Sequence, residues 1–433
     1  MDKNICYDNI CGIKKTNVRW ALLSMVYFTC LIAYLDRVNL SVCAPAIMAD
    51  FGFDKVQLGL TMSAFFIAYA VTQIPGALLA ERFGIRATGT LAMGWWSVFT
   101  VLTPFAWNFW SFFAVRAAFG AGEGPMFPNN GAFIARWFSP REKAIPNSIM
   151  LSGAFIGPAL GPPIAVAIMT LWGWQMVFYI FGGVGLAAAI IWHLCARDYP
   201  QQHSGVNEAE LEHIVGSETK TIEKAGVAPW KLFLKSPQFW CLGLQYLAVN
   251  YIFYLFLSWL PMYLVEARGL SLARMGLAAA IPWVALAVGL IVSGIVSDRL
   301  IARGSSKFRA RSVMAMAGLT LCGIGLYQAA NSATLTENVF WLTVSLGCLS
   351  GSYTGAWAAC QDLGKKFGGS TVAWMNTWGT IAGILAPTVT ALLVNAIGWQ
   401  AALNGSSVVV AFGVLFWLFV KPDKPLLVET KTN

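Results

Sequence analysis

Four ionisable residues lie inside apolar runs of about 20 residues, a length that can span a bilayer: Asp36 and Arg37 in the first run, and Arg116 and Glu123 in the fourth. Charged side chains are energetically unfavourable at bilayer depth, so those that occur there usually face a cavity and take part in function. Carboxylates can carry protons and guanidinium groups can bind an anion. The chain has only three histidines, so carboxylates are the expected proton carriers.

The spacing of Arg116 and Glu123, seven residues or two turns, places both on one face of a helix. Gly120 lies between them and leaves room for a substrate or a neighbouring backbone. We predict that Asp36 and Glu123 couple to protons and that Arg37 or Arg116 binds a carboxylate. The alternative is that the four residues form permanent ion pairs between two helices. Buried ion pairs are poor stabilisers, which favours the functional interpretation.

Polar and aromatic side chains also occur in pairs one helical turn apart, so the members of each pair share a helix face. They could direct hydroxyl, amide or indole groups into a substrate-binding cavity. Alternatively, each pair could form interhelical hydrogen bonds or an aromatic packing stripe. The pairs are Tyr69 and Gln73, Asn250 and Tyr254, Tyr353 and Trp357, and Asn376 and Thr380.

The elements that must position these residues are membrane helices. The chain has 433 residues, of which 57% are hydrophobic and only 11% charged, too few charges to cover a soluble protein of this size. Lipid is therefore the expected surrounding, and the apolar runs predict an all-α membrane protein with twelve transmembrane helices. The predicted spans are 20–45, 57–80, 87–106, 109–133, 146–170, 174–195, 239–265, 274–298, 311–330, 337–361, 370–396 and 400–420.

The net charge of +9 follows the topology of these spans. All Lys and Arg residues but five lie at the termini or in alternate loops, the pattern expected of the cytoplasmic side. The exceptions are Lys55, Arg268 and Arg274 on the other side, and Arg37 and Arg116 inside helices. Both termini are therefore predicted to be cytoplasmic, in a multi-pass protein of the (inner) cell membrane. The basic charge is no sign of nucleic-acid binding.

A long polar stretch divides the chain near its middle. We predict an N-terminal six-helix bundle (1–195), a cytoplasmic linker (196–236) with a short capped helix beginning near Asn207, and a C-terminal six-helix bundle (237–433). Sequence echoes indicate that the halves are pseudo-symmetric copies, an arrangement common in secondary transporters. The matching segments are Gly173-Trp174-Gln175 with Gly398-Trp399-Gln400, Gly153-xxx-Gly157 with Gly379-xxx-Gly383, and Ala80-Glu81-Arg82 with Ser297-Asp298-Arg299.

Charged residues at the predicted cytoplasmic helix ends could gate transport. They could form a latch that holds an outward-facing state through contacts with helix termini. The simpler alternative is a set of solvated turns, but the duplicated position favours the latch. These residues are Glu81, Arg82, Arg86, Asp298 and Arg299.

Three motifs carry a family resemblance: Gly76-Ala-Leu-Leu-Ala-Glu81-Arg82-Phe-Gly-Ile-Arg86, Arg116-xxx-Gly120-Ala-Gly-Glu123, and Tyr34-Leu-Asp36-Arg37-Val-Asn39-Leu40. The first resembles the loop signature of the major facilitator superfamily, with Glu81 where Asp is usual. The other two resemble its anion:cation symporter family, which includes bacterial sugar-acid and phthalate proton symporters. The resemblance implies that Asp36 and Glu123 are proton sites and that Arg37 contacts the anion. It also favours Tyr69, Tyr254, Trp357 and Asn376 as cavity-lining residues.

The fifth span carries the main argument for a rival function. Gly153-xxx-Gly157-Pro158-xx-Gly161-Pro162-Pro163 permits close helix contact and bending, and a similar motif marks antiporters in related proteins. Pro125 and Pro128 are expected to kink the fourth helix near Glu123.

These features together predict a proton-coupled symporter that imports a small organic carboxylate, with a sugar acid (aldonate, hexuronate or aldarate) as first choice. An importer of an aromatic acid such as phthalate, an antiporter that exports an organic compound, and a transporter-like sensor are the alternatives. No phosphate-binding loop, catalytic triad or metal-ligand cluster stands out. We therefore expect no cofactor beyond the proton gradient, no metal and no enzymatic activity, in a protein that works as a monomer.

Overall fold

The computed structural model describes residues 15–139, 142–215 and 229–426, and all regular secondary structure in these residues is helical. Short helices α7 (Glu208–Val215) and α8 (Trp230–Phe233) lie in the predicted linker. The other helices are α1 (Val18–Phe51), α2 (Lys55–Leu102), α3 (Phe109–Glu123), α4 (Met126–Trp137), α5 (Ala144–Trp172), α6 (Trp174–Cys195), α9 (Pro237–Glu266), α10 (Leu272–Ala302), α11 (Met314–Asn331), α12 (Leu335–Gly364) and α13 (Gly368–Trp417).

Eight helical segments of the described chain are long and apolar enough to cross a membrane. They do not include α3 and α4, which are short because the helix is interrupted at Gly124 and Pro125. They also do not include α12, which is rich in Gly, Ser and Thr. The predicted all-helical, multi-pass architecture is confirmed. The count of twelve spans and the division at residues 195 and 236 stay predictions.

Two glycines explain why twelve predicted spans become fewer continuous helices. Gly84 lies within α2 with φ 85° and ψ 164°, and Gly398 lies within α13 with φ 80° and ψ 170°. Such positive φ values are rarely adopted by residues with a side chain. The predicted spans 57–80 and 87–106 lie on either side of Gly84, and 370–396 and 400–420 lie on either side of Gly398.

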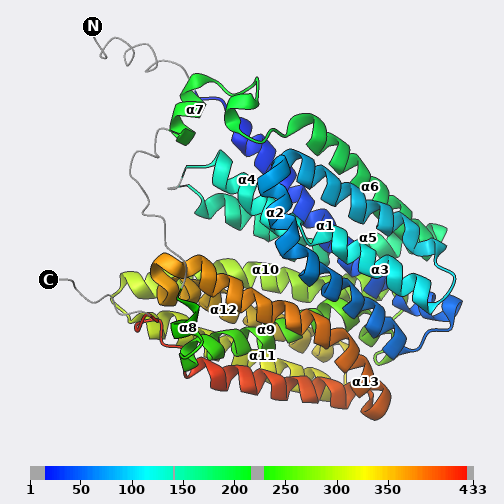
Figure 1. Ribbon diagram of the computed structural model, residues 1–433. Coiled ribbons are helices and arrows are strands. Elements are labelled where there is room, and N and C mark those ends of the chain that lie inside the picture. The colour runs from blue at the N-terminus through cyan, green and yellow to red at the C-terminus, as the bar shows by residue number, and fades with distance from the viewer. Residues whose placement is uncertain (1–14, 140–141, 216–228, 427–433) are drawn as a thin grey trace, which may run out of the picture.

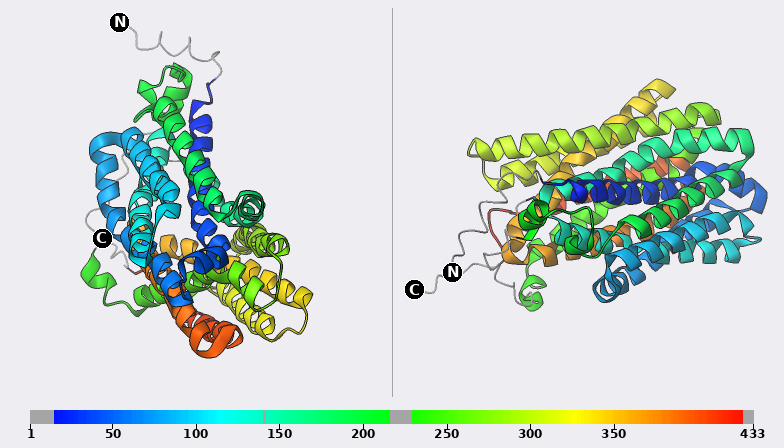
Figure 2. Two further views of the ribbon diagram at one scale, coloured as in Figure 1. Left: turned by 90° about the vertical axis from the view of Figure 1, so that its right-hand side faces the viewer. Right: turned by 90° about the horizontal axis from the view of Figure 1, so that it is seen from above.

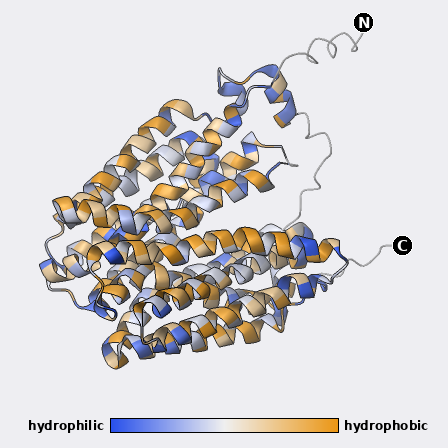
Figure 3. Ribbon diagram, turned by 180° about the vertical axis from the view of Figure 1, so that it is seen from behind, coloured by the Kyte–Doolittle hydropathy of each residue, from blue (hydrophilic) through white to orange (hydrophobic). Residues whose placement is uncertain are grey.

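The helices gather in two groups (Figure 1). Helices α1 to α6, blue to green, lie together, and α9 to α13, green to red, lie together beside them. The left view of Figure 2 shows the same separation. Figure 3 shows apolar residues along the outside of both groups, where exposed side chains such as Ile74, Leu91, Ile190 and Ile291 fit a lipid surrounding.

The short helix predicted near Asn207 is confirmed as α7, whose first turn is capped by the Asn207 side chain accepting from Glu210 N at 2.9 Å. Glu210 is fully buried and joins α7 to the start of α1. Its carboxylate accepts hydrogen bonds from the backbone of Val18 and Arg19 and from the Arg19 guanidinium at 2.9 Å. The N-terminal part of the predicted linker is therefore packed on the first helix group. Residues 216–228 lie outside the described chain.

One contact is repeated in the two groups and supports their predicted relation. Trp174, after Gly173, donates its indole N–H to Asp50 Oδ2 at 2.6 Å, near the end of α1. Trp399, after Gly398, donates in the same way to Glu266 Oε2 at 2.9 Å, at the end of α9. Both glycines have φ near 80°, so the Gly-Trp-Gln echo in the sequence marks the same local geometry in both groups.

Candidate functional site

A cavity of about 630 Å³ lies between the two helix groups. This volume is within the usual range for sites that hold a small molecule. Its wall is formed by α1, α2, α4 and α5 from one group and by α9, α12 and α13 from the other. Nine of the ten candidate substrate-binding residues named from the sequence line it: Arg37, Tyr69, Gln73, Asn250, Tyr254, Tyr353, Trp357, Asn376 and Thr380. The tenth, Arg116, does not.

Arg37 is held at the cavity wall by an ion pair with Glu123. Its Nε donates to Glu123 Oε1 at 2.7 Å, and its Nη2 donates to the same oxygen. Both side chains are nearly fully buried, whereas the other carboxylate oxygen of Glu123 has no hydrogen-bond partner among the described residues. A fixed guanidinium paired with a carboxylate can exchange that partner for the carboxylate of a solute.

Aromatic rings surround the Arg37 guanidinium. The ring centroids of Tyr34, Phe65 and Tyr69 lie 4.4, 4.9 and 5.2 Å from its Cζ atom, within the range of cation–π attraction. Tyr254 reaches the same place from the other helix group, and its ring centroid lies 4.5 Å from that of Phe66. Residues of both groups thus meet at the charged end of the cavity.

Arg116 and Asp36 lie behind Arg37, away from the main cavity. Arg116 lines a void of only about 20 Å³, its Cζ atom is 4.3 Å from the Phe119 ring, and its Nε and Nη1 have no partner in the described chain. Asp36 is fully buried beside Trp96, and neither carboxylate oxygen reaches hydrogen-bonding geometry with a described donor. Arg116 acts electrostatically on Asp36 and Glu123. The four buried ionisable groups thus form one cluster, of which only Arg37 lines the main cavity.

Close backbone approach explains how the cluster is assembled. A Cβ added at Gly120 would lie 2.2 Å from Phe65 O, so this glycine makes room for the backbone of α2. A Cβ added at Gly124 would lie 2.2 Å from Thr72 Oγ1, and one at Gly76 would lie 2.5 Å from Pro125 Cβ. The kink predicted at Pro125 is present as the break between α3 and α4. It places Glu123 at the end of α3, where it meets Arg37 of α1.

The wall contributed by the second helix group is neutral. Tyr353 donates its hydroxyl to Asn250 Oδ1 at 3.1 Å, and Asn250 Nδ2 donates to Tyr246 O at 2.9 Å. The interhelical hydrogen bond weighed as an alternative role is therefore present at Tyr353, although the residue also lines the cavity. Thr380 donates back to Asn376 O at 3.1 Å. The half-buried Asn376 supplies an amide group to the same wall.

The two helix groups close on each other at one end of the cavity. Ser63 on α2 donates to Ile384 O at 2.7 Å and contacts Thr388 Oγ1 at 2.8 Å, both on α13. Farther out, Lys55 at the start of α2 forms a 3.2 Å ion pair with Glu266 at the end of α9. This carboxylate is the one that also accepts from Trp399.

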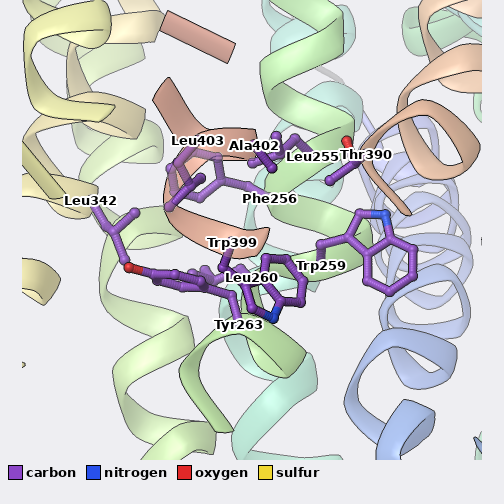
Figure 4. A pocket seen from close by; sticks show the side chains of 10 residues that line it. All are labelled: Leu255, Phe256, Trp259, Leu260, Tyr263, Leu342, Thr390, Trp399, Ala402 and Leu403. Atoms are coloured by element: carbon purple, nitrogen blue, oxygen red, sulfur yellow. The ribbon is translucent and has the colours of Figure 1, made fainter. Parts of the chain in front are cut away.

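The residues beside this closed end are tightly packed. Figure 4 shows Trp259, Tyr263 and Trp399 around a void of only about 10 Å³. The ring centroids of Trp259 and Tyr263 lie 6.1 and 5.6 Å from that of Trp399. This void is too small for an organic solute, so the cavity that contains Arg37 is the candidate site.

The five predicted gating residues lie at the other end, and among the described residues none of them forms a hydrogen bond or ion pair with the other helix group. Arg86 Nε donates to His193 O at 2.7 Å, and Asp298 lies 3.5 Å from Arg311. Arg82 stacks near Phe83 at 5.2 Å, whereas Glu81 and Arg299 are exposed. The part of the chain that the structure describes has no latch between the groups here, as expected if this end is open, and the gating role stays a prediction.

The glycine-rich motif of α5 packs against α1. A Cβ at Gly153 would lie 2.9 Å from Tyr27 O, and one at Gly157 would lie 2.7 Å from Tyr34 Cβ. Helix contact therefore accounts for both glycines. The same argument applies to Gly379, which packs on Tyr246 of α9 in the second group.

Several cavity residues were not among the predicted site residues. Tyr34, Tyr246, Asn147 and Gln361 all line the cavity. A signal was present for three of them, since each lies one helical turn from a predicted residue: Tyr34 from Arg37, Tyr246 from Asn250, and Gln361 from Trp357. The pair Lys55 and Glu266 had no such signal, because 211 positions separate them in the chain.

Comparisons with known proteins agree with this architecture. A model of the Major Facilitator Superfamily matches residues 26–387. The probable galactarate/D-glucarate transporter GudP of Bacillus subtilis (strain 168) is 32% identical over 443 residues, which cover 96% of this chain and 95% of that protein. The probable L-galactonate transporter of Escherichia coli (strain K12) is 29% identical over 93% of this chain and 89% of its own length.

Solved structures show the same fold. The crystal structure of a bacterial homologue of the human lysosomal transporter Spinster, in an inward-facing and occupied conformation, matches with a TM-score of 0.77. The match covers 94% of this chain and 97% of that one, at 17% sequence identity.

Proposed function

Because this chain belongs to the Major Facilitator Superfamily and similar relatives are named as galactarate/D-glucarate and L-galactonate transporters, we propose that it is a proton-coupled symporter that imports a small organic anion. The observation that carries the proposal is the position of Arg37. It lines the cavity as a cation and is held in place by Glu123. A solute carboxylate that enters the cavity would bind the same guanidinium that Glu123 holds, which couples the anion to the charge state of Glu123.

Proton coupling would follow from this competition. When Glu123 takes up a proton it loses its charge, and its ion pair with Arg37 weakens, so that Arg37 can receive the anion. When the proton leaves, Glu123 recovers Arg37 and the anion is displaced. Asp36 and Arg116, behind this pair, would relay or balance the charge.

Alternating access would move the site between the two sides of the membrane. We assign the closed end, with Lys55 and Glu266, to the outside, and the open end, with Glu81 and Asp298, to the cytoplasm. In this assignment the structure is an inward-facing state, like the crystallised conformation of the Spinster homologue. Twelve spans with both termini in the cytoplasm, in the inner membrane of the cell and as a monomer, complete the proposed arrangement.

A sugar acid fits the cavity best. Its carboxylate would bind Arg37, and its hydroxyl groups would face the neutral side chains of Asn376, Thr380 and Gln361. Relatives named as galactarate/D-glucarate and L-galactonate transporters support this class. An aromatic acid such as phthalate is the second choice, since Trp357 and several tyrosines also line the wall.

The Glu123→Gln variant tests the proposed coupling. It removes the titratable group but keeps the shape and a hydrogen-bonding oxygen, so anion binding should persist while pH-driven accumulation in proteoliposomes is lost. The matched control is Glu208→Gln on the exposed first turn of α7, which should accumulate the anion as the unmodified protein does. Uphill uptake by the Glu123 variant at the normal level would remove Glu123 from the mechanism.

A further inference from the structure

The described cavity wall carries charge at one residue only, and this limits the charge of the solutes that it can bind. Among the lining residues that the structure describes, Arg37 alone is charged, and no Lys, His, Asp or Glu accompanies it. The remaining polar groups are amides, hydroxyls and the indole N–H of Trp357, and nine of the lining residues are aromatic.

The second buried arginine cannot serve the far end of a solute. Arg116 lines only the small void that Arg37 also lines, and of the two arginines only Arg37 lines the cavity. The part of the wall that α12 and α13 contribute presents Trp357, Asn376 and Thr380, none of which is charged. An anionic group at that wall would meet amides, a hydroxyl and the electron-rich faces of aromatic rings.

We infer that the cavity selects solutes with one carboxylate and a neutral hydroxylated tail, so that aldonates and hexuronates are substrates and dicarboxylates such as aldarates and phthalate are poor ones. This inference rests on the proposed function and narrows its substrate class. One carboxylate neutralises the charge of Arg37. A second would be taken out of water with no cation to pair with, which is strongly unfavourable.

Three ligands of nearly equal size separate charge from shape. Galactarate differs from galactonate only in a carboxylate in place of the terminal hydroxymethyl group, and the monoamide of galactarate restores a single charge at almost the same shape. Binding to the purified full-length protein is measured by isothermal titration calorimetry at pH 7. Galactonate should bind roughly tenfold or more tightly than galactarate. The monoamide should bind as galactonate does.

Two variants test the same inference by changing the protein instead of the ligand. Asn376→Lys adds a cation to the neutral wall, and Asn376→Gln adds length without charge. The lysine variant should shift the preference toward galactarate by roughly tenfold or more, whereas the glutamine variant should keep the original order.

The outcomes keep the two proposals apart. Equal or tighter binding of galactarate by the unmodified protein overturns the selection of single carboxylates but leaves the sugar-acid importer intact. Weak binding of both galactarate and its monoamide also overturns it, because shape and not charge would then exclude the diacid. If none of the three ligands binds, the proposed sugar-acid function itself fails.

Discussion

Arg37 and Arg116 differ in what they face, and this difference decides which of them is expected to bind the solute. Arg37 lines the cavity and has a carboxylate partner, whereas Arg116 contacts a phenylalanine ring in a nearly filled void. Lysine keeps the charge of arginine but loses the planar fork that binds a carboxylate through two hydrogen bonds. We therefore expect Arg37→Lys and Arg116→Lys to have different effects.

Arg37→Lys should weaken anion binding by roughly tenfold or more, because the bidentate contact is lost. Arg116→Lys should leave the dissociation constant within about threefold and instead change the pH dependence of uptake, since Arg116 acts on Asp36 and Glu123. Calorimetric titration and uptake at several pH values measure the two effects. A tenfold loss of affinity in the Arg116 variant with none in the Arg37 variant would reverse the assignment.

Sequence spacing placed Arg116 and Glu123 on one helix face but could not decide which arginine enters the cavity. That choice depends on the rotation of α1 and α3 about their axes, which long-range packing sets. Gly120 shows the link, since its contact with the Phe65 backbone fixes how α3 meets α2. Tyr69 and Asn376 line the cavity together with Gln73 and Thr380, their partners one helical turn away. Spacing alone predicted the shared helix face of each pair, and the family resemblance favoured the cavity over packing between helices.

At the scale of helices, the close contact of α3 with α2 positions Glu123. Gly120→Ala would place a Cβ 2.2 Å from Phe65 O, so the helices must separate, with an expected loss of about 1–3 kcal/mol of stability. Gly94→Ala is the matched control, because nothing lies within 4 Å of its added Cβ. Thermal unfolding in detergent compares the two. A Gly120 variant as stable as the Gly94 variant would show that the contact is not required.

An ion pair between the start of α2 and the end of α9 is expected to help close one end of the cavity. Lys55 and Glu266 pair between the helix groups while partly exposed, so the ion pair should contribute about 0.5 kcal/mol to the closed end. Lys55→Glu should open this end in a larger share of molecules. The double variant Lys55→Glu with Glu266→Lys should restore closure.

Hydrogen–deuterium exchange at the start of α2 and the end of α9 measures this opening. Faster exchange is expected in the single variant and the original rate in the double variant. If the Lys55→Glu variant exchanges as slowly as the unmodified protein, the ion pair has no part in closing this end, and contacts between α2 and α13 such as those of Ser63 hold it.

At the scale of the whole molecule, the sequence predicted an all-helical membrane protein because apolar runs of about 20 residues have few alternatives. The breaks at Gly84 and Gly398 fall between predicted spans, as hydropathy requires. The packing of α7 on α1 through Glu210 was not foreseen, since an acidic residue in a polar stretch carries no sign of burial. The pairing of Lys55 with Glu266 was also not foreseen, because it forms only where the two helix groups meet.

In the proposed function, the two helix groups carry an anion and a proton together across the membrane, with Arg37 as the one cation among the described residues that line the cavity. The most direct test of this account follows protons and galactonate together in proteoliposomes. The account predicts that added galactonate enters with protons, alkalinises the outside and accumulates against its gradient, and that Arg37→Ala abolishes all three. Protons that enter only as a preloaded compound leaves, with no galactonate uptake, would contradict the account and identify an exporter.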